Sequence, residues 1–119
     1  MLNVQIFTTP KSQAGKKAER FFKERNIKPH IINLNERPLS KGEMQRFVDK
    51  FGLEALINSK SKSYERQGLA YMRLSVEMLL EKFATDAELI EQPLIRSGNQ
   101  LAIGWDEAFW RDVIAKAKG

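Results

Sequence analysis

Hydrophobic and polar positions change their period several times along this chain. Residues 3–8 include β-branched and aromatic residues beside polar ones, and Thr9 and Pro10 follow them. This pattern predicts a first strand. Beyond Pro10 the apolar residues recur at helical spacing, at Ala14, Ala18, Phe21 and Phe22. Ser12 stands where the N-cap of this helix belongs, and Asn26 ends it. Residues 30–34 are a second short strand, so the first third predicts a βαβ unit with parallel strands.

The middle of the chain has a helical period. Ser40 and Glu43 have the spacing of a capping box, and Gly52 stops the helix that follows. Residues 53–57 predict a further short turn of helix, and the basic, polar residues 59–63 predict an exposed loop. Ser75 is the expected cap of another helix, and Thr85 or Asp86 opens a turn toward Ile90. The apolar stripes of the two helices are Met44, Phe47, Val48 and Phe51, then Val76, Leu79, Leu80 and Phe83.

The last third returns to a β pattern. Residues 92–96 and 100–103 predict a hairpin across Gly98 and Asn99. Asp106 is the expected cap of a final helix with an inner face of Phe109, Trp110, Val113, Ile114 and Ala117. The element order βαβ, helices, ββα predicts an α/β fold with a mixed sheet of about four strands.

Length and composition narrow the class of protein. At 119 residues, with 42% hydrophobic and 29% charged residues, the chain has the size and balance of one globular domain. No apolar run approaches the roughly 20 residues that a membrane helix needs. The first residues lack the basic and apolar regions of a signal peptide, so we expect a cytoplasmic protein without a membrane association.

The chain contains no cysteine and a single histidine, His30. Disulfides, thiolate nucleophiles and sulfur-ligated metals are therefore excluded. A metal site would need carboxylates alone, and no cluster of acidic residues has a suitable spacing. We expect neither a metal nor a bound cofactor.

The net charge is +5 and the sequence pI is about 9.6, which raises the question of nucleic-acid binding. The densest basic group is Lys11, Lys16, Lys17 and Arg20, followed by Lys60 and Lys62. Neither group is interleaved with aromatic residues as in a base-stacking surface. A solvated basic surface is favoured over a nucleic-acid site.

Five segments in a fixed order carry a family resemblance. They are residues 6–12 with 16–18, 37–40, 56–60, 92–95 and 103–105. Over essentially its whole length the chain resembles the arsenate reductase (ArsC) and Spx family, which has a thioredoxin-like fold. The resemblance implies one domain, with residues 1–36 and 90–119 as the thioredoxin-like core and about 37–89 as a helical insertion.

The resemblance also implies where the thiol chemistry belongs. The family places a cysteine at position 12, at a helix start whose backbone N–H groups and dipole lower the thiol pKa, and some members place a second cysteine at position 15. Here these residues are Ser12 and Gly15. A serine needs a general base to act as a nucleophile, and nothing in the sequence directs His30, the one imidazole, toward it. We favour Ser12 as an N-cap over Ser12 as a nucleophile.

The arginines with which the reductases neutralise an oxyanion are replaced as well. By resemblance these positions correspond to Lys60, to Gln92 and to a residue near Trp105. Lys60 keeps the charge without the bidentate fork of an arginine, and Gln92 has no charge. The resemblance further implies a cis bond between Gln92 and Pro93, whereas the residues alone are equally compatible with a trans proline at a strand start.

Two functions remain open without sulfur. The helix start could hold a small anion or a glutathione-like carboxylate through Ser12, Gln13, Ala14 and Gly15, with Lys11, Lys60, Gln92 and Pro93 around it; a capped, unoccupied helix end is the simpler reading. External glutathione at Ser12 would give an arsenate reductase-like or glutathione-dependent oxidoreductase. Spx-type relatives dock to RNA polymerase, which by resemblance implies a binding or regulatory role. Phe109 and Trp110 are expected in the core, and Trp105 is the better surface candidate.

Overall fold

The computed structural model describes residues 2–118, which fall into two compact units. Unit 1 combines Met1–Asn33 with Gln92–Gly119, and unit 2 is the intervening Leu34–Glu91. The elements of unit 1 are β1 (Gln5–Thr8), α1 (Gln13–Glu24), β2 (His30–Asn33), β3 (Leu94–Ser97), β4 (Gln100–Ile103) and α5 (Glu107–Lys118). Those of unit 2 are α2 (Lys41–Phe51), α3 (Lys62–Arg66) and α4 (Val76–Thr85), with the 3-10 turns η1 (Leu53–Leu56), η2 (Leu69–Tyr71) and η3 (Ala87–Leu89).

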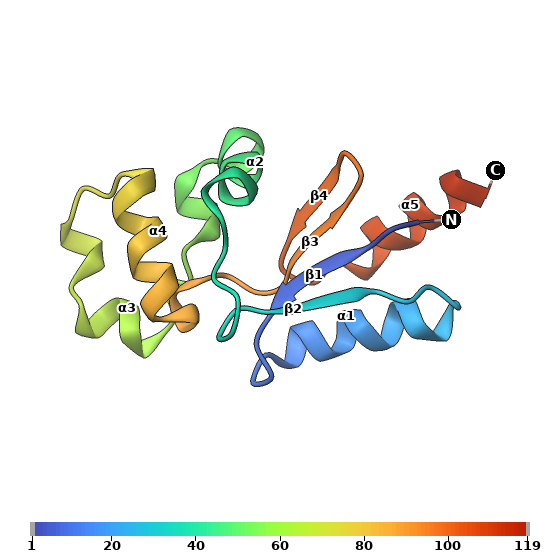
Figure 1. Ribbon diagram of the computed structural model, residues 1–119, viewed down its shortest axis with the longest axis horizontal. Coiled ribbons are helices and arrows are strands. Elements are labelled where there is room, and N and C mark those ends of the chain that lie inside the picture. The colour runs from blue at the N-terminus through green and yellow to red at the C-terminus, as the bar shows by residue number, and fades with distance from the viewer. Residues whose placement is uncertain (1, 119) are drawn as a thin grey trace. The chain divides into compact units, whose positions relative to one another are not determined.

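The strands of unit 1 form one mixed sheet in the order β2-β1-β3-β4. β1 pairs with β2 in parallel and with β3 antiparallel, and β3 continues to β4 as a hairpin. Figure 1 shows β1 and β3 running side by side in the middle of this sheet. The predicted α/β fold with four strands is confirmed, although β1 begins later and β2 ends earlier than the sequence pattern indicated.

One face of the sheet and the two helices of unit 1 share a hydrophobic core. Alternate residues of the first strand segment, Val4 and Ile6, lie on this face with Ile95 of β3, because side chains alternate between the faces of a strand. Buried residues of α1 and α5 pack against them: Ala18, Phe21, Phe22, Trp110 and Ile114. Burial of this stripe is what holds α1 on the sheet, since a helix of its length has little stability alone.

Helix boundaries in unit 1 follow their predicted caps. Ser12 is the N-cap of α1, Asn26 follows the helix with a positive φ of 60°, and Asp106 accepts the N–H of Phe109 at the start of α5. The hairpin turns through Gly98 and Asn99, and Gly98 has a φ of 60°, a conformation that favours glycine. The peptide bond between Gln92 and Pro93 is cis, as the resemblance implied.

Unit 2 is built from short capped helices around its own buried residues. Ser40, Ser75 and Asp86 cap α2, α4 and η3 as predicted, and Gly52 ends α2 with a φ of 89°. In the capping box the Glu43 carboxylate accepts from the Ser40 hydroxyl at 2.9 Å rather than from the Ser40 backbone. The buried side chains of these helices include Met44, Phe47, Leu56, Leu79 and Phe83.

The predicted exposed loop at residues 59–63 is wrong in its second half. Ser61 caps α3, and the Ser63 side chain is fully buried. The Ser63 hydroxyl donates to the Asp86 carboxylate and accepts from Gln67 Nε2 at 2.9 Å. A serine with two polar partners loses little by burial, and that pairing between distant residues leaves no mark in the local pattern.

Trp105 keeps access to the surface but also packs against α1. Its ring is half-buried and lies edge-on to Phe21, with ring centroids 5.1 Å apart, and near Phe22 at 6.1 Å. Trp110 is fully buried and Phe109 half-buried, as expected for core residues. Among residues 2–118, no helix has the length and apolar character needed to cross a membrane.

Candidate functional site

The candidate site is the start of α1 with the loop that leads into it from β1. Thr8 ends β1, and the chain turns through Thr9, Pro10 and Lys11, with the Ser12 N–H donating to the Thr9 carbonyl at 3.1 Å. The parallel pairing of β1 with β2 and the packing of α1 on the sheet fix where this turn lies. The loop therefore lies where the family resemblance implies a reactive side chain.

Ser12 uses its hydroxyl to cap the helix. Its Oγ accepts the N–H of Gly15 at 3.0 Å, and its carbonyl accepts the N–H of Lys16 at 3.1 Å. The N-cap interpretation is confirmed. Among the described residues, no acceptor is recorded for the backbone N–H groups of Gln13 and Ala14, which are the donors that this helix end still offers.

No imidazole is available to activate Ser12. His30 is paired with Gln5 at the start of β1, whereas Ser12 follows the end of that strand. A four-residue strand spans roughly 10 Å, so the two side chains belong to opposite ends of the sheet. Because a serine hydroxyl is a poor nucleophile without a base, the site offers a hydrogen-bonding group and no activated one.

Gly15 is buried against Thr8. A Cβ atom added to Gly15 would lie 2.1 Å from Thr8 Oγ1 and 3.0 Å from Thr8 Cβ. In this chain, position 15 therefore cannot take a cysteine, or any other side chain, unless Thr8 moves. The cavity of about 300 Å³ beside the loop is lined in part by Thr8, Thr9, Gly15 and Lys16.

Gln92 closes the other side of the loop. Its Oε1 accepts the Thr9 N–H at 2.8 Å, the Thr9 hydroxyl at 3.1 Å and the Thr8 hydroxyl at 3.3 Å. At this position the reductases, by resemblance, supply a cation that faces an oxyanion. Here the residue is a neutral acceptor, and it engages donors of the loop itself. Sequence reasoning identified Gln92 as a lost charge but not as a partner of Thr9, because nothing local links two residues so far apart in the chain.

The remaining candidates are distributed over both units. Lys11 is exposed and has no ion pair among the described residues, and Pro93 is buried, with its carbonyl accepting from the Gly104 N–H at 2.8 Å. Lys60 belongs to unit 2, where its backbone N–H donates to Asn58 Oδ1 at 3.2 Å. Within unit 1 the structure brings together the loop, the helix start and Gln92.

Comparison with known proteins places this geometry in a family. Residues 7–113 match the family model described as "ArsC family". An uncharacterised protein of Bacillus subtilis, YusI, is 26% identical over 110 residues, covering 89% of this chain and 93% of its own length. The global transcriptional regulator Spx of Streptococcus mutans is 24% identical, covering 87% of this chain and 77% of the relative.

Reductases are among the similar proteins too. An arsenate reductase of Neisseria meningitidis is 24% identical over 107 residues, covering 87% of this chain and 92% of its own. The solved structure of an arsenate reductase from Vibrio cholerae superposes with a TM-score of 0.74 at 23% identity, over 96% of this chain and 97% of that one. At this identity the structural likeness establishes the fold alone.

Proposed function

This chain belongs to the ArsC family, and we propose that it is a member without thiol chemistry whose role is to bind another protein. The observation that carries the proposal is the pair of substitutions at the candidate site. The Ser12 hydroxyl caps α1, and Gln92 Oε1 accepts hydrogen bonds from Thr8 and Thr9. Position 12 has no thiol that could exchange electrons with an oxyanion, and position 92 has no cation that could neutralise one.

The relatives supply the alternative to catalysis. Both transcriptional regulators and arsenate reductases are similar to this chain over most of its length. A regulatory role by contact does not depend on a nucleophile, whereas reduction of arsenate does. We therefore propose a binding or regulatory function, with RNA polymerase as the first partner to test because of the resemblance to Spx-type proteins.

The binding function is tested with purified RNA polymerase. The chain is treated with diamide or with dithiothreitol, desalted, mixed with polymerase and analysed by size-exclusion chromatography and native mass spectrometry. We expect the same amount of complex after both treatments, because the chain has no thiol to switch. Absence of any complex at micromolar concentration would exclude this partner.

The lack of reductase activity is tested by restoring the sulfur. Arsenate reduction is measured for the native chain and for Ser12→Cys with glutathione and glutaredoxin supplied. We expect Ser12→Cys to reduce arsenate no faster than the native chain, since Gln92 Oε1 still accepts the Thr9 N–H of the loop. Turnover by the native chain would contradict the proposal, whereas recovery by Ser12→Cys would show a scaffold that lacks only its nucleophile and would contradict the role given to Gln92.

A second candidate function is weak binding of a small anion at the start of α1. The observation that favours it is the pair of free N–H groups at Gln13 and Ala14 above the Ser12 cap. Titration with phosphate or glutathione, followed by the amide shifts of residues 13–15, tests this site. Saturable shifts confined to these residues would support it, and a linear drift would reject it.

A further inference from the structure

Two features of the sequence that the candidate site leaves unused meet in one cavity of unit 1. They are the basic residues of α1 and Trp105. The cavity has a volume of about 710 Å³, within the range of ligand and peptide sites, and lies between α1 and the segment from Trp105 into α5. Its charged lining residues are Lys17, Arg20, Arg25, Arg111, Glu24 and Glu107.

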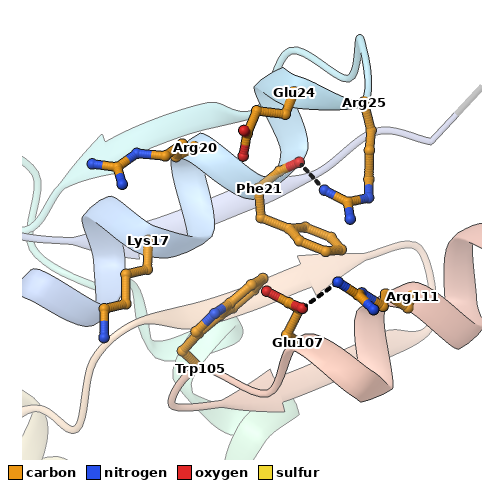
Figure 2. Close-up of a pocket in the computed structure, with 8 residues that line it drawn as sticks. All are labelled: Lys17, Arg20, Phe21, Glu24, Arg25, Trp105, Glu107 and Arg111. Carbon is orange, nitrogen blue, oxygen red and sulfur yellow. Dashed lines mark hydrogen bonds and ion pairs between the residues drawn. The ribbon is translucent and has the colours of Figure 1, made fainter.

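The cations of this cavity differ in whether they are already engaged. Arg111 pairs with Glu107 at 2.6 Å, and Arg25 lies 3.7 Å over the Phe21 ring and donates to the Phe21 carbonyl at 3.0 Å. Figure 2 shows both of these contacts, and no dashed line to Lys17 or Arg20. Lys17 and Arg20 are exposed and have no ion pair among the described residues. They are the charges that the fold leaves for an outside partner.

The position of Lys17 argues against a structural role. The first turn of α1 has no acidic residue, and lysines follow directly after it. A cation near a helix N-terminus is unfavourable because of the helix dipole, so Lys17 does not stabilise the helix by its position. Elsewhere on α1 the cation Lys23 is neutralised by Glu19 at 2.6 Å. Lys17 and Arg20 are one turn apart on the same side of the helix, so they can hold two acidic groups spaced along an extended segment.

Trp105 supplies the apolar part of the cavity. Its ring is half-buried and lies edge-on to Phe21, with ring centroids 5.1 Å apart, and it lines the cavity. A tryptophan held in place by a neighbouring ring and still accessible on one side is typical of protein interaction sites. In Figure 2 the Trp105 and Phe21 rings lie between the side chains of α1 and Arg111.

We infer that this cavity docks an acidic peptide segment that carries an apolar side chain. The acidic groups pair with Lys17 and Arg20, and the apolar side chain rests on Trp105. Glu24 and Glu107 favour a peptide over a nucleic acid, because their carboxylates can accept peptide N–H groups, which a phosphodiester backbone does not offer. The inference rests on the proposed binding function, for which it names the surface and the chemistry of the partner.

The probe is an acetylated and amidated octapeptide of glutamate and aspartate with two central leucines. Binding to the full chain is followed by amide and indole N–H shifts and by Trp105 fluorescence. The test variant is Lys17→Gln with Arg20→Gln, and the matched control is Lys28→Gln with Lys62→Gln. Both remove two exposed positive charges from the net charge of +5, but only the first pair lines this cavity.

We expect saturable shifts at Lys17, Arg20 and Trp105, and binding about fivefold weaker in the test variant, as the loss of two exposed ion pairs predicts. The control variant should bind within about twofold of the native chain. Equal weakening of both variants, or shifts elsewhere, would overturn the inference by reducing the effect to net charge. A short DNA duplex that shifts the same residues where the peptide does not would overturn it in favour of nucleic acid.

The two proposals fail in different ways. A polymerase complex that forms equally well with the test variant leaves the binding function standing and rejects this surface. Peptide binding at the cavity without any polymerase complex supports the surface and rejects that partner.

Discussion

At the scale of single residues, the start of α1 is closed by groups that satisfy one another. Ser12 caps the helix, Gln92 engages the Thr9 N–H, and Gly15 lies flat against Thr8. Each contact occupies space or a donor that thiol chemistry would need. The loss of the cysteine is thus accompanied by packing that suits its absence.

Gly15→Ala measures how tightly this packing is set. The new Cβ would meet Thr8 Oγ1 at 2.1 Å, so we expect a loss of about 1–3 kcal/mol in the free energy of unfolding. Urea denaturation followed by circular dichroism gives the value. Gly42→Ala is the matched control, because nothing lies within 4 Å of its Cβ position in α2, and it should stabilise by about 0.5–1 kcal/mol.

A double-mutant cycle with Thr8→Ala identifies the cause. If the clash with Thr8 is responsible, Gly15→Ala should cost less in the Thr8→Ala background than in the native one. An unchanged cost would place the strain elsewhere.

Whether the sequence predicts a contact of this site depends on how far apart its two residues lie along the chain. The Ser12 cap follows from local chemistry, because an N-cap needs only a hydroxyl before a helical period. The contacts of Gln92 with Thr9 and of Gly15 with Thr8 depend on tertiary packing, and no local pattern encodes them. The same distinction explains why Trp105 was expected on the surface and lies against Phe21.

At the scale of elements, caps and turns predicted most boundaries, and α3 and η2 are the exceptions. Ser40, Ser75, Asp86 and Asp106 all cap where expected, since each precedes an apolar run of helical period. α3 is short and basic, with no apolar stripe to reveal it. It is held by Ser63, whose partners Asp86 and Gln67 lie on different elements.

Ser63→Ala should therefore loosen α3. Removal of the hydroxyl leaves the Asp86 carboxylate and the Gln67 amide each short of a partner, which we expect to cost about 1–3 kcal/mol. Hydrogen exchange should report the loss first at residues 62–66. Ser59→Ala, at an exposed serine nearby, is the control and should change stability by less than about 0.5 kcal/mol. Equal effects of the two variants would contradict the role of the buried hydroxyl.

The start of α4 has a charge contact that responds to pH. The pKa of Glu77 is lowered from its usual 4.5 by its own backbone N–H at the helix start and, secondarily, by Lys41, whose Nζ lies 3.2 Å from the carboxylate. A carboxyl group with a lowered pKa stabilises the fold above its unfolded pKa, and this stabilisation is lost as the pH falls through the folded value.

Glu77→Gln tests this contact through the acid side of the stability curve. We expect the native chain to be more stable than Glu77→Gln at pH 6, with the difference shrinking once the pH drops below about 4.5. Urea midpoints measured between pH 3 and 7 give the curve. A difference that grows toward low pH would have the wrong sign and would reject the assignment.

At the scale of the whole molecule, the positive charge is spread over the surface. Two i,i+4 pairs on α5 and one on α1 neutralise part of it locally, and the net charge of +5 remains distributed among many exposed side chains. Such a surface attracts nucleic acid weakly and without a preferred site.

The affinity for duplex DNA should accordingly depend only on the number of positive charges. We expect weak binding that disappears by about 150 mM salt, with the same loss for Lys17→Gln/Arg20→Gln as for Lys28→Gln/Lys62→Gln. Fluorescence anisotropy over a salt series measures it. A steep salt slope, or a marked difference between the two variants, would indicate a defined nucleic-acid site.

The contact between Gln92 and Thr9 has a mechanical consequence. Unit 2 is joined to unit 1 by two peptide links, and Gln92 is the first residue beyond the second link. A pulling force along the chain at this link acts first on the hydrogen bond from the Thr9 N–H to Gln92 Oε1, because β3 begins only at Leu94. Tension applied to the insertion by a bound partner would thus be felt at the turn before α1, so that the turn for which the family resemblance implies a cysteine is, in this chain, a point of strain transmission.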